Sequence, residues 1–250
     1  MFSSTDYDKL QQIMNESPEK SDLLSRLLES HRMEISTISH EIRNPLTLVY
    51  STLQLLESQH PEVLSFRHWN ELHQDIEYMN QLLQDLSSYN NGERLICQPV
   101  DLNTYLKVLA LSFASSIVDT EIEFTSKIAP DLPTISLDSV KIKQALLNLL
   151  RNARDAVLSD NAASHPAICM EVSTGEKQIR IIISDTGCGI APEDLSSIFE
   201  PFVTHKSDGT GLGLAITKRI IVSHGGSIDV ISTPGHGTIF TILLPIQQNT

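Results

Sequence analysis

A histidine followed directly by an acid is the first candidate for chemistry in this chain. His40 and Glu41 precede Asn44 and Pro45 in the run His-Glu-Ile-Arg-Asn-Pro. An imidazole can attack phosphorus when one ring nitrogen is free and the other N–H is held, and an adjacent carboxylate can take or orient that proton. Proline removes a helical N–H and bends the chain one turn later. Taken alone, the run fits an ordinary exposed histidine and a simple kink at least as well.

Two asparagines one helical turn apart form a second candidate site. Asn148 and Asn152 are spaced i, i+4 within an otherwise apolar stretch, so a helix places both amides on one face. An amide oxygen is a hard ligand of the kind that Mg²⁺ accepts while it takes its other ligands from water and phosphate. The pair indicates a polar ligand with a metal ion, although two surface amides would show the same spacing.

A glycine-containing segment offers a place for a purine ring. Asp185, Gly187 and Gly189 follow an apolar run that is typical of a buried strand. A carboxylate there can accept a hydrogen bond from an adenine amino group, and the glycines let the backbone approach a ring. The same residues are also ordinary turn chemistry, so this signal is weak by itself.

A second glycine segment opens a predicted helix, where free backbone N–H groups can meet phosphate. Its members are Gly209, Thr210, Gly211, Leu212 and Gly213. A loop precedes it and no Lys-Ser/Thr follows it, so it is neither a Rossmann fingerprint nor a P-loop. Between the two segments, apolar anchors within residues 198–203 lead to a polar stretch with Lys206, as in a mobile lid. The Lys206 ammonium could bind a phosphate as a point charge, or it is a solvated loop lysine.

The histidine is expected to lie on the first of two long amphipathic helices. Residues 21–58 and 64–89 each hold apolar residues in steps of four and three, and Pro61 lies between them. At about 100° per residue, His40 points roughly 160° away from its stripe, and Asn44 shares its face. A short connection predicts an antiparallel hairpin. Because one hairpin cannot bury both stripes, two chains should pair into a four-helix bundle.

After about residue 93, strands alternate with helices. The pattern predicts helices over 101–118, 138–159 and 210–224, with Asp138 as an N-cap, and strands over 121–128, 168–174, 178–185, 227–233 and 237–245. Several strands with helices on one side indicate an α/β sandwich. The expected organisation is a tail or short helix over 1–20, a helical domain over 21–92 and a ligand-binding domain over 93–250.

Composition narrows the classes of function. The chain has 250 residues and a formal charge of −13, which repels phosphate backbones and anionic lipid and argues against nucleic-acid binding. No stretch approaches the ~18 apolar residues of a membrane span, and no signal peptide is visible. Cys97, Cys169 and Cys188 show no paired spacing, which favours a reducing cytosol over disulfides or a zinc site. We therefore expect a cytoplasmic protein without membrane insertion.

Taken together and in this order, the segments resemble the bacterial sensor histidine kinases of two-component systems, over roughly residues 25–246. Residues 40–45 look like the phosphoacceptor box of that family, 148–153 like its asparagine box, 185–189 like its first glycine box, 199–202 like its phenylalanine box and 209–213 like its second glycine box. The resemblance places Asn152 at the metal-ligand position and Asp185 at the adenine-reading position. It implies a dimeric helical bundle followed by an ATP-binding α/β sandwich of the histidine kinase/Hsp90-like type.

The resemblance also implies an activity. With ATP and Mg²⁺, a homodimer would phosphorylate His40 and pass the phosphoryl group to an aspartate in the receiver domain of a response regulator, while Asn44 would serve the reverse, phosphatase reaction. No sensor domain precedes the bundle, so input is expected from a separate sensor protein or through residues 1–30. Alternatives are a phosphotransfer or phosphatase adaptor with little kinase activity, and a repair- or chaperone-type ATPase, which the histidine box disfavours. One departure is Asp155, which stands where many relatives carry Lys or Arg, with Arg154 beside it.

Overall fold

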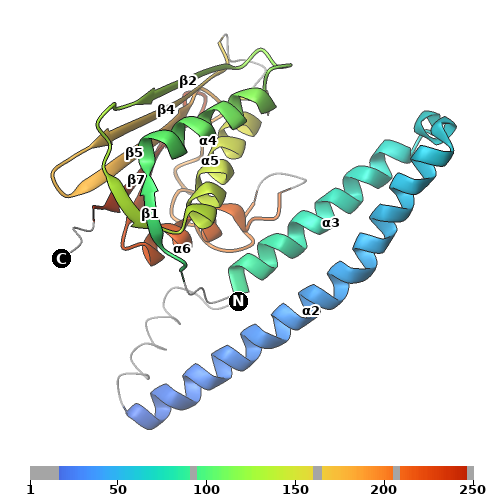
Figure 1. Ribbon diagram of the computed structural model, residues 1–250, viewed down its shortest axis with the longest axis horizontal. Coiled ribbons are helices and arrows are strands. Elements are labelled where there is room, and N and C mark those ends of the chain that lie inside the picture. Colours follow the sequence, from blue (N-terminus) through green and yellow to red (C-terminus); the bar gives the residue numbers. More distant parts are fainter. Residues whose placement is uncertain (1–16, 91–94, 160–164, 205–208, 247–250) are drawn as a thin grey trace. The chain divides into compact units, whose positions relative to one another are not determined.

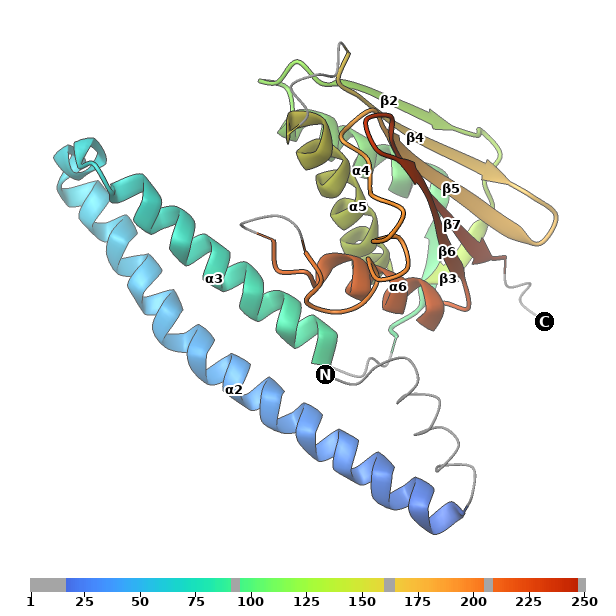
Figure 2. The ribbon, with the colours of Figure 1, turned by 180° about the vertical axis from the view of Figure 1, so that it is seen from behind.

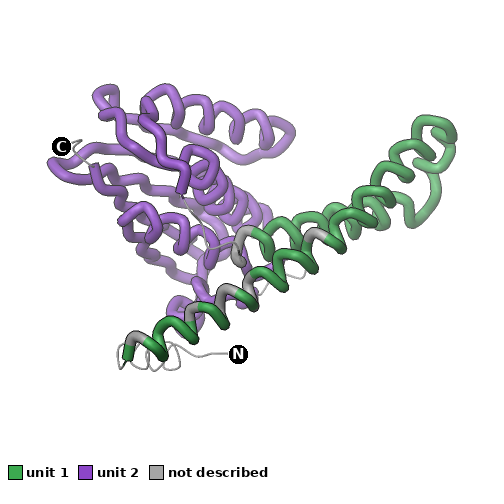
Figure 3. Tube along the Cα trace, turned by 60° about the horizontal axis from the view of Figure 1, so that its bottom comes forward, with its two compact units in different colours: residues 1–93 green, residues 94–250 purple. Residues whose placement is uncertain are grey.

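The computed structural model describes residues 17–90, 95–159, 165–204 and 209–246. The chain forms two compact units, with the boundary between Glu93 and Arg94 (Figure 3). Within the described residues, the first unit contains helices and no strands, and the second combines strands and helices (Figure 1). No helix within the described residues combines the length and the apolar character needed to cross a bilayer.

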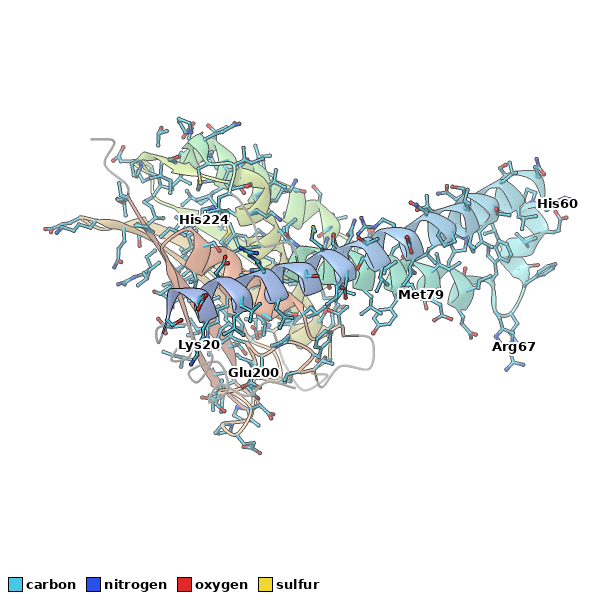
Figure 4. All side chains as sticks on the ribbon, turned by 90° about the horizontal axis from the view of Figure 1, so that it is seen from below. Lys20, His60, Arg67, Met79, Glu200 and His224 are labelled. Carbon is cyan, nitrogen blue, oxygen red and sulfur yellow. The ribbon has the colours of Figure 1, made fainter. Side chains whose placement is uncertain are left out.

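The first unit is a hairpin of two long helices, α2 (Pro18–Gln59) and α3 (Trp69–Asn90), joined by the short 3₁₀ helix η1 (Pro61–Ser65). The α2 helix starts at the N-cap Ser17, whose hydroxyl accepts a hydrogen bond from the Lys20 N–H, and it continues through Pro45. The second helix begins five residues later than predicted, because the residues after Pro61 close i→i+3 turns instead. His60, which follows α2, marks the closed end of the hairpin in Figure 4.

The apolar stripe of each helix divides into two seams. One seam is buried inside the hairpin and consists of Leu46, Leu53, Ile76 and Leu83, with Tyr50 and Trp69 packed against it. The other seam stays exposed in the single chain and consists of Ile38, Ile42, Val49 and Leu56 on α2 and Leu72 and Met79 on α3; Met79 is labelled in Figure 4. This division is the one expected when each helix packs against two neighbours with a four–three spacing.

The second unit is built on a five-stranded sheet in the order β2-β4-β5-β7-β6. The bounds are Glu123–Ile128 for β2, Ala167–Thr174 for β4, Gln178–Asp185 for β5, Ser227–Thr233 for β6 and Gly237–Pro245 for β7. Only β2 and β4 run parallel to each other, while the other neighbours are antiparallel. A separate pair, β1 (Gln98–Asp101) with β3 (Thr134–Leu137), was not predicted, because each strand has only four residues.

Three helices cover one face of this sheet, as Figures 1 and 2 show. They are α4 (Leu102–Ser116), α5 (Ser139–Ser159) and α6 (Gly213–Ser223). Alternate residues of β5 are buried beneath them, ending at Asp185, and the apolar face of α5 is buried along its length. The predicted fold class, a helical hairpin followed by an α/β sandwich, is confirmed.

Candidate active site

Helix α5 brings the predicted site segments together. The Asn148 amide nitrogen donates to the Gly213 carbonyl at 3.3 Å, at the start of α6. Two turns further along α5, the Ala156 carbonyl accepts from the Cys188 N–H at 3.4 Å. The two glycine segments therefore lie along one helix, about 12 Å apart at 1.5 Å per residue. Asn152 lies midway between them and is half-buried.

The first glycine segment begins at a buried carboxylate. Asp185 ends β5, and its Oδ1 accepts from the Gly187 N–H at 2.9 Å. A Cβ on Gly187 would lie 2.7 Å from the Ala156 Cβ, so glycine is required there by contact with α5. Gly189 has φ +70°, and a Cβ there would collide with the backbone of Thr233. Both glycines are thus needed by the protein's own packing, whereas the sequence had suggested only a close approach of a ligand.

The turn between β6 and β7 supports this segment. The Ile190 N–H donates to the Ser232 hydroxyl at 2.8 Å, and the Gly235 N–H donates to the Cys188 carbonyl at 2.8 Å. The Ser232 hydroxyl in turn donates to the Gly237 carbonyl at 2.9 Å. Sequence reasoning missed Ser232, because a single serine in a strand carries no signal of a contact more than forty residues away.

The second glycine segment is held at Gly211. Its φ is +66°, and a Cβ would lie 2.6–2.7 Å from the Phe202 backbone. The Phe202 N–H donates to the Gly211 carbonyl at 2.9 Å, and Phe202 itself has φ 66°, which is rare for a bulky residue. The left-handed Gly211 cannot belong to a helix, so α6 starts at Gly213 and not at Thr210 as predicted. Gly209 to Leu212 precede the helix, whose first-turn N–H groups lack intrahelical partners.

The phenylalanine segment is anchored to the core at one end. The Phe199 ring lies edge-on to Phe240 of β7, with centroids 6.4 Å apart, and the Lys218 ammonium lies 5.2 Å from the Phe199 centroid. Phe202, by contrast, is exposed. Lys206, the predicted phosphate contact, lies outside the described residues.

The histidine segment lies on α2. Glu41 and Asn44 are exposed, while the His40 side chain lies outside what the structure describes. Arg43, to which the sequence assigned no role, donates from Nη2 to the Leu83 carbonyl on α3 at 3.2 Å. This bond ties the turn after His40 to the neighbouring helix.

The donor set can be compared with the needs of Mg²⁺. Asn152 lies between the two glycine segments, where an amide oxygen suits a hard cation that keeps several waters and shares phosphate oxygens. Among the described residues, no three His, Cys, Asp or Glu side chains gather into a group that could hold a metal ion. The residues present therefore fit Mg²⁺ bound together with phosphate.

The departure at Asp155 has a local explanation. The Arg154 guanidinium bonds Asp155 Oδ1 through Nη2 at 3.1 Å and Nε at 3.3 Å, and both side chains are about one-third exposed. The acid thus neutralises the base beside it. Asp155 also lies one turn nearer to the first glycine segment than Asn152 does, away from the Asn148–Gly213 contact.

Comparison with known proteins identifies both units. Residues 30–94 match the His Kinase A (phospho-acceptor) domain, and residues 137–248 match the histidine kinase-, DNA gyrase B- and HSP90-like ATPase family. A helical hairpin with a phosphoacceptor-domain sequence, followed by an ATPase-type sandwich, defines a histidine kinase core. The chain belongs to the bacterial sensor histidine kinases of two-component systems.

Individual relatives agree with this assignment. The signal transduction histidine-protein kinase AtoS of Escherichia coli (strain K12) is 34% identical over 210 residues, which are 84% of this chain and 34% of AtoS. Sensor histidine kinase ZraS of the same organism is 32% identical over 217 residues, or 84% of this chain and 44% of ZraS. Full-length ShkA, solved in complex with AMPPNP, has a TM-score of 0.71 and 28% identity, covering 87% of this chain and 46% of ShkA. The chain spans less than half the length of each of these relatives.

Proposed function

We propose that this chain is an ATP-dependent protein-histidine kinase that phosphorylates His40 and passes the phosphoryl group to an aspartate of a response-regulator receiver domain. The observation that carries the proposal is the convergence of both glycine segments on the Asn148–Ala156 face of α5. Full-length ShkA, whose similarity covers 87% of this chain, was solved in complex with AMPPNP, an ATP analogue. ATP is therefore the expected nucleotide.

We assign roles along α5 from its two ends. Asp185 and the backbone near Gly187 and Gly189 would read adenine at one end. The second glycine segment, the first turn of α6 and Lys206 would hold the triphosphate at the other end, in contact with Asn148. Asn152, midway between them, would hold Mg²⁺, which neutralises charge on the phosphates.

The chemical step would be an in-line displacement. A ring nitrogen of His40 attacks the γ-phosphorus, the new P–N bond forms, and the bond to the leaving ADP oxygen breaks. Glu41, adjacent and exposed, would accept or orient the proton on the other ring nitrogen. The phosphoramidate product is suited to onward transfer, and catalysis rests mainly on positioning.

We further propose that residues 21–92 form the dimerisation and phosphotransfer domain and residues 93–250 the catalytic domain. The exposed seam of the hairpin supports a homodimer, because six large apolar side chains on two adjacent helices stay in contact with water in the single chain. Residues 1–16 of the predicted tail over 1–20 lie outside the described residues, and the role of this tail as an input segment stays a prediction.

Incubation with γ-labelled ATP tests the proposal. Wild-type protein should take up label that is labile in acid and stable in base, and His40→Gln should take none while it binds ATP normally. His68→Gln, which changes another exposed histidine paired with an acid, is the matched control and should label normally. Full labelling of His40→Gln would refute the assignment of the phosphoacceptor.

The same assay tests reverse phosphatase activity, for which we propose Asn44. Its amide is exposed one turn from His40, where it could orient a water toward the phospho-aspartate of a docked receiver. Asn44→Ala should label normally but slow the loss of label from the phosphorylated partner. A fall in labelling with unchanged dephosphorylation would place Asn44 in the kinase step or in helix geometry.

A further inference from the structure

A buried carboxylate fastens the start of the second unit to helix α5. Asp138 is only 7% exposed. Its Oδ2 accepts from the Ile96 N–H at 3.0 Å, and its Oδ1 accepts from the Val140 and Lys141 N–H groups at 3.1 Å each. Burial would raise the pKa of this carboxyl, but these three N–H donors outweigh burial and hold the pKa below its ordinary value. Asp138 is therefore a charged acceptor at neutral pH, which strengthens each of these bonds.

A buried histidine at the end of α6 holds the same residue from the other side. The Asp138 N–H donates to His224 Nε2 at 3.0 Å. Because a backbone N–H can only donate, Nε2 must accept, so the ring proton lies on Nδ1 and is donated to the Ile220 carbonyl at 2.8 Å. His224 is labelled in Figure 4. Asp138 thus joins three segments: the chain at Ile96, the start of α5 and the end of α6.

Each of these three segments carries, or connects to, residues that are proposed to take part in phosphoryl transfer. The chain that enters at Ile96 comes from the hairpin that carries His40. Helix α5 carries Asn148 and Asn152, and α6 begins at the second glycine segment. Among the described residues that follow the hairpin, Ile96 is the first one that is hydrogen-bonded to the rest of the second unit. The next is Gln98, which pairs with Leu137.

We propose that Asp138 is a positioning residue for autophosphorylation: by holding Ile96, it fixes the length of the tether between His40 and the nucleotide site. The proposal rests on the kinase function proposed above. Without this bond the first fastening moves from Ile96 to Gln98, which lengthens the tether by up to about 7 Å. A longer tether lowers the effective concentration of His40 at the nucleotide site. The phosphoryl transfer to His40 is also sensitive to a misplacement of about 1 Å.

Asp138→Asn removes the fastening and keeps the helix cap. The Asn Oδ1 still accepts from the first turn of α5, but its NH₂ group faces the Ile96 N–H and cannot accept from it. Asp101→Asn is the matched control, because Asp101 caps α4 in the same unit through the Asn103 and Thr104 N–H groups. Among the described residues, the Asp101 carboxylate is hydrogen-bonded to Asn103 and Thr104 and not to Ile96.

The experiment measures autophosphorylation kinetics of the full chain together with amide hydrogen exchange. Asp138→Asn should lower kcat about three- to tenfold, leave the KM for ATP within twofold, and speed exchange at Ile96; Asp101→Asn should change none of these. Ile96→Pro deletes the donor itself and should lower kcat similarly, and the double variant should fall no further.

The outcomes separate the two proposals. If wild-type protein takes no acid-labile label, the kinase function fails, while exchange at Ile96 still reports the fastening. If wild-type protein labels and Asp138→Asn exposes Ile96 without lowering kcat, the positioning role is overturned. A rise in the KM for ATP that matches the loss of kcat would also overturn it, because Asp138 would then act only through the integrity of α5.

Discussion

Asp185 makes one observed hydrogen bond and is proposed to make a second one to adenine, and a single substitution can separate the two. Its Oδ1 holds the Gly187 N–H, and its carboxylate is proposed to accept from the adenine amino group. In Asp185→Asn the amide oxygen can keep the first bond, but the NH₂ group cannot accept the second. Leaving a donor unpaired costs about 1–3 kcal/mol, so ATP affinity should fall roughly 5- to 150-fold, as measured by titration calorimetry.

The selectivity for ATP over GTP provides a control for this prediction. Asp185→Asn should also blunt discrimination against GTP, which lacks an amino group at that ring position, whereas Asp229→Asn, at an exposed strand position, should change neither affinity. Equal affinity of the wild-type protein for ATP and GTP would contradict the adenine-reading role.

At the residue level, the sequence singled out Gly187, Gly189 and Gly211 for ligand binding, which stays a prediction, and the structure adds a packing reason for each of these glycines. The order of the five motifs predicted that Asp185, Asn152 and the glycine segments belong to one site, and α5 does bring them together. The contact of Gly187 with Ala156, and the support from Ser232, depend on packing between distant segments. Such packing leaves no local pattern, so it could not be predicted from spacing.

At the level of elements, periodic segments were predicted well and their starts less well. The two C-terminal strands match their predicted ranges, because alternation and a Pro-Gly turn define them locally. Helices α3 and α6 start late for specific reasons: the 3₁₀ turn after Pro61 and the left-handed Gly211. The strands β1 and β3 are too short for a visible period, and each depends on the other for its hydrogen bonds.

The Phe202–Gly211 contact gives a prediction at this scale. Gly211→Ala should cost the left-handed penalty, about 1–2 kcal/mol, and in addition a clash of its Cβ with the Phe202 backbone. Gly235→Ala is the matched control, because φ is +73° there and nothing lies within 4 Å of the added Cβ. Denaturant unfolding should show a larger loss of stability for Gly211→Ala, and its ATP affinity should fall as well. Equal losses of stability for both variants would show that the Phe202 backbone moves away from the added Cβ without a measurable loss of stability.

At the scale of the whole molecule, the hairpin and the sandwich differ in how much of their apolar surface is buried within a single chain. The sandwich buries the apolar core between its sheet and its helices within a single chain. The hairpin buries one apolar seam and leaves the second in water. The exposed seam supports the proposed homodimer, in which a second hairpin of the same kind would complete a four-helix bundle with the four–three spacing of both stripes.

Val49 lies in the exposed seam, at 47% exposure, between the buried Leu46 and Leu53. Val49→Asp should weaken the homodimer strongly, because a two-fold interface loses the burial of two valines, about 3 kcal/mol or more, and gains two desolvated charges. The expected result is a dissociation constant at least about 100-fold higher by analytical ultracentrifugation, with ATP affinity unchanged. Leu111→Asp on α4, at a residue 68% exposed, is the control and should leave the dimer intact. If both variants dimerise as the wild type does, the seam is covered by something other than a second copy of the hairpin.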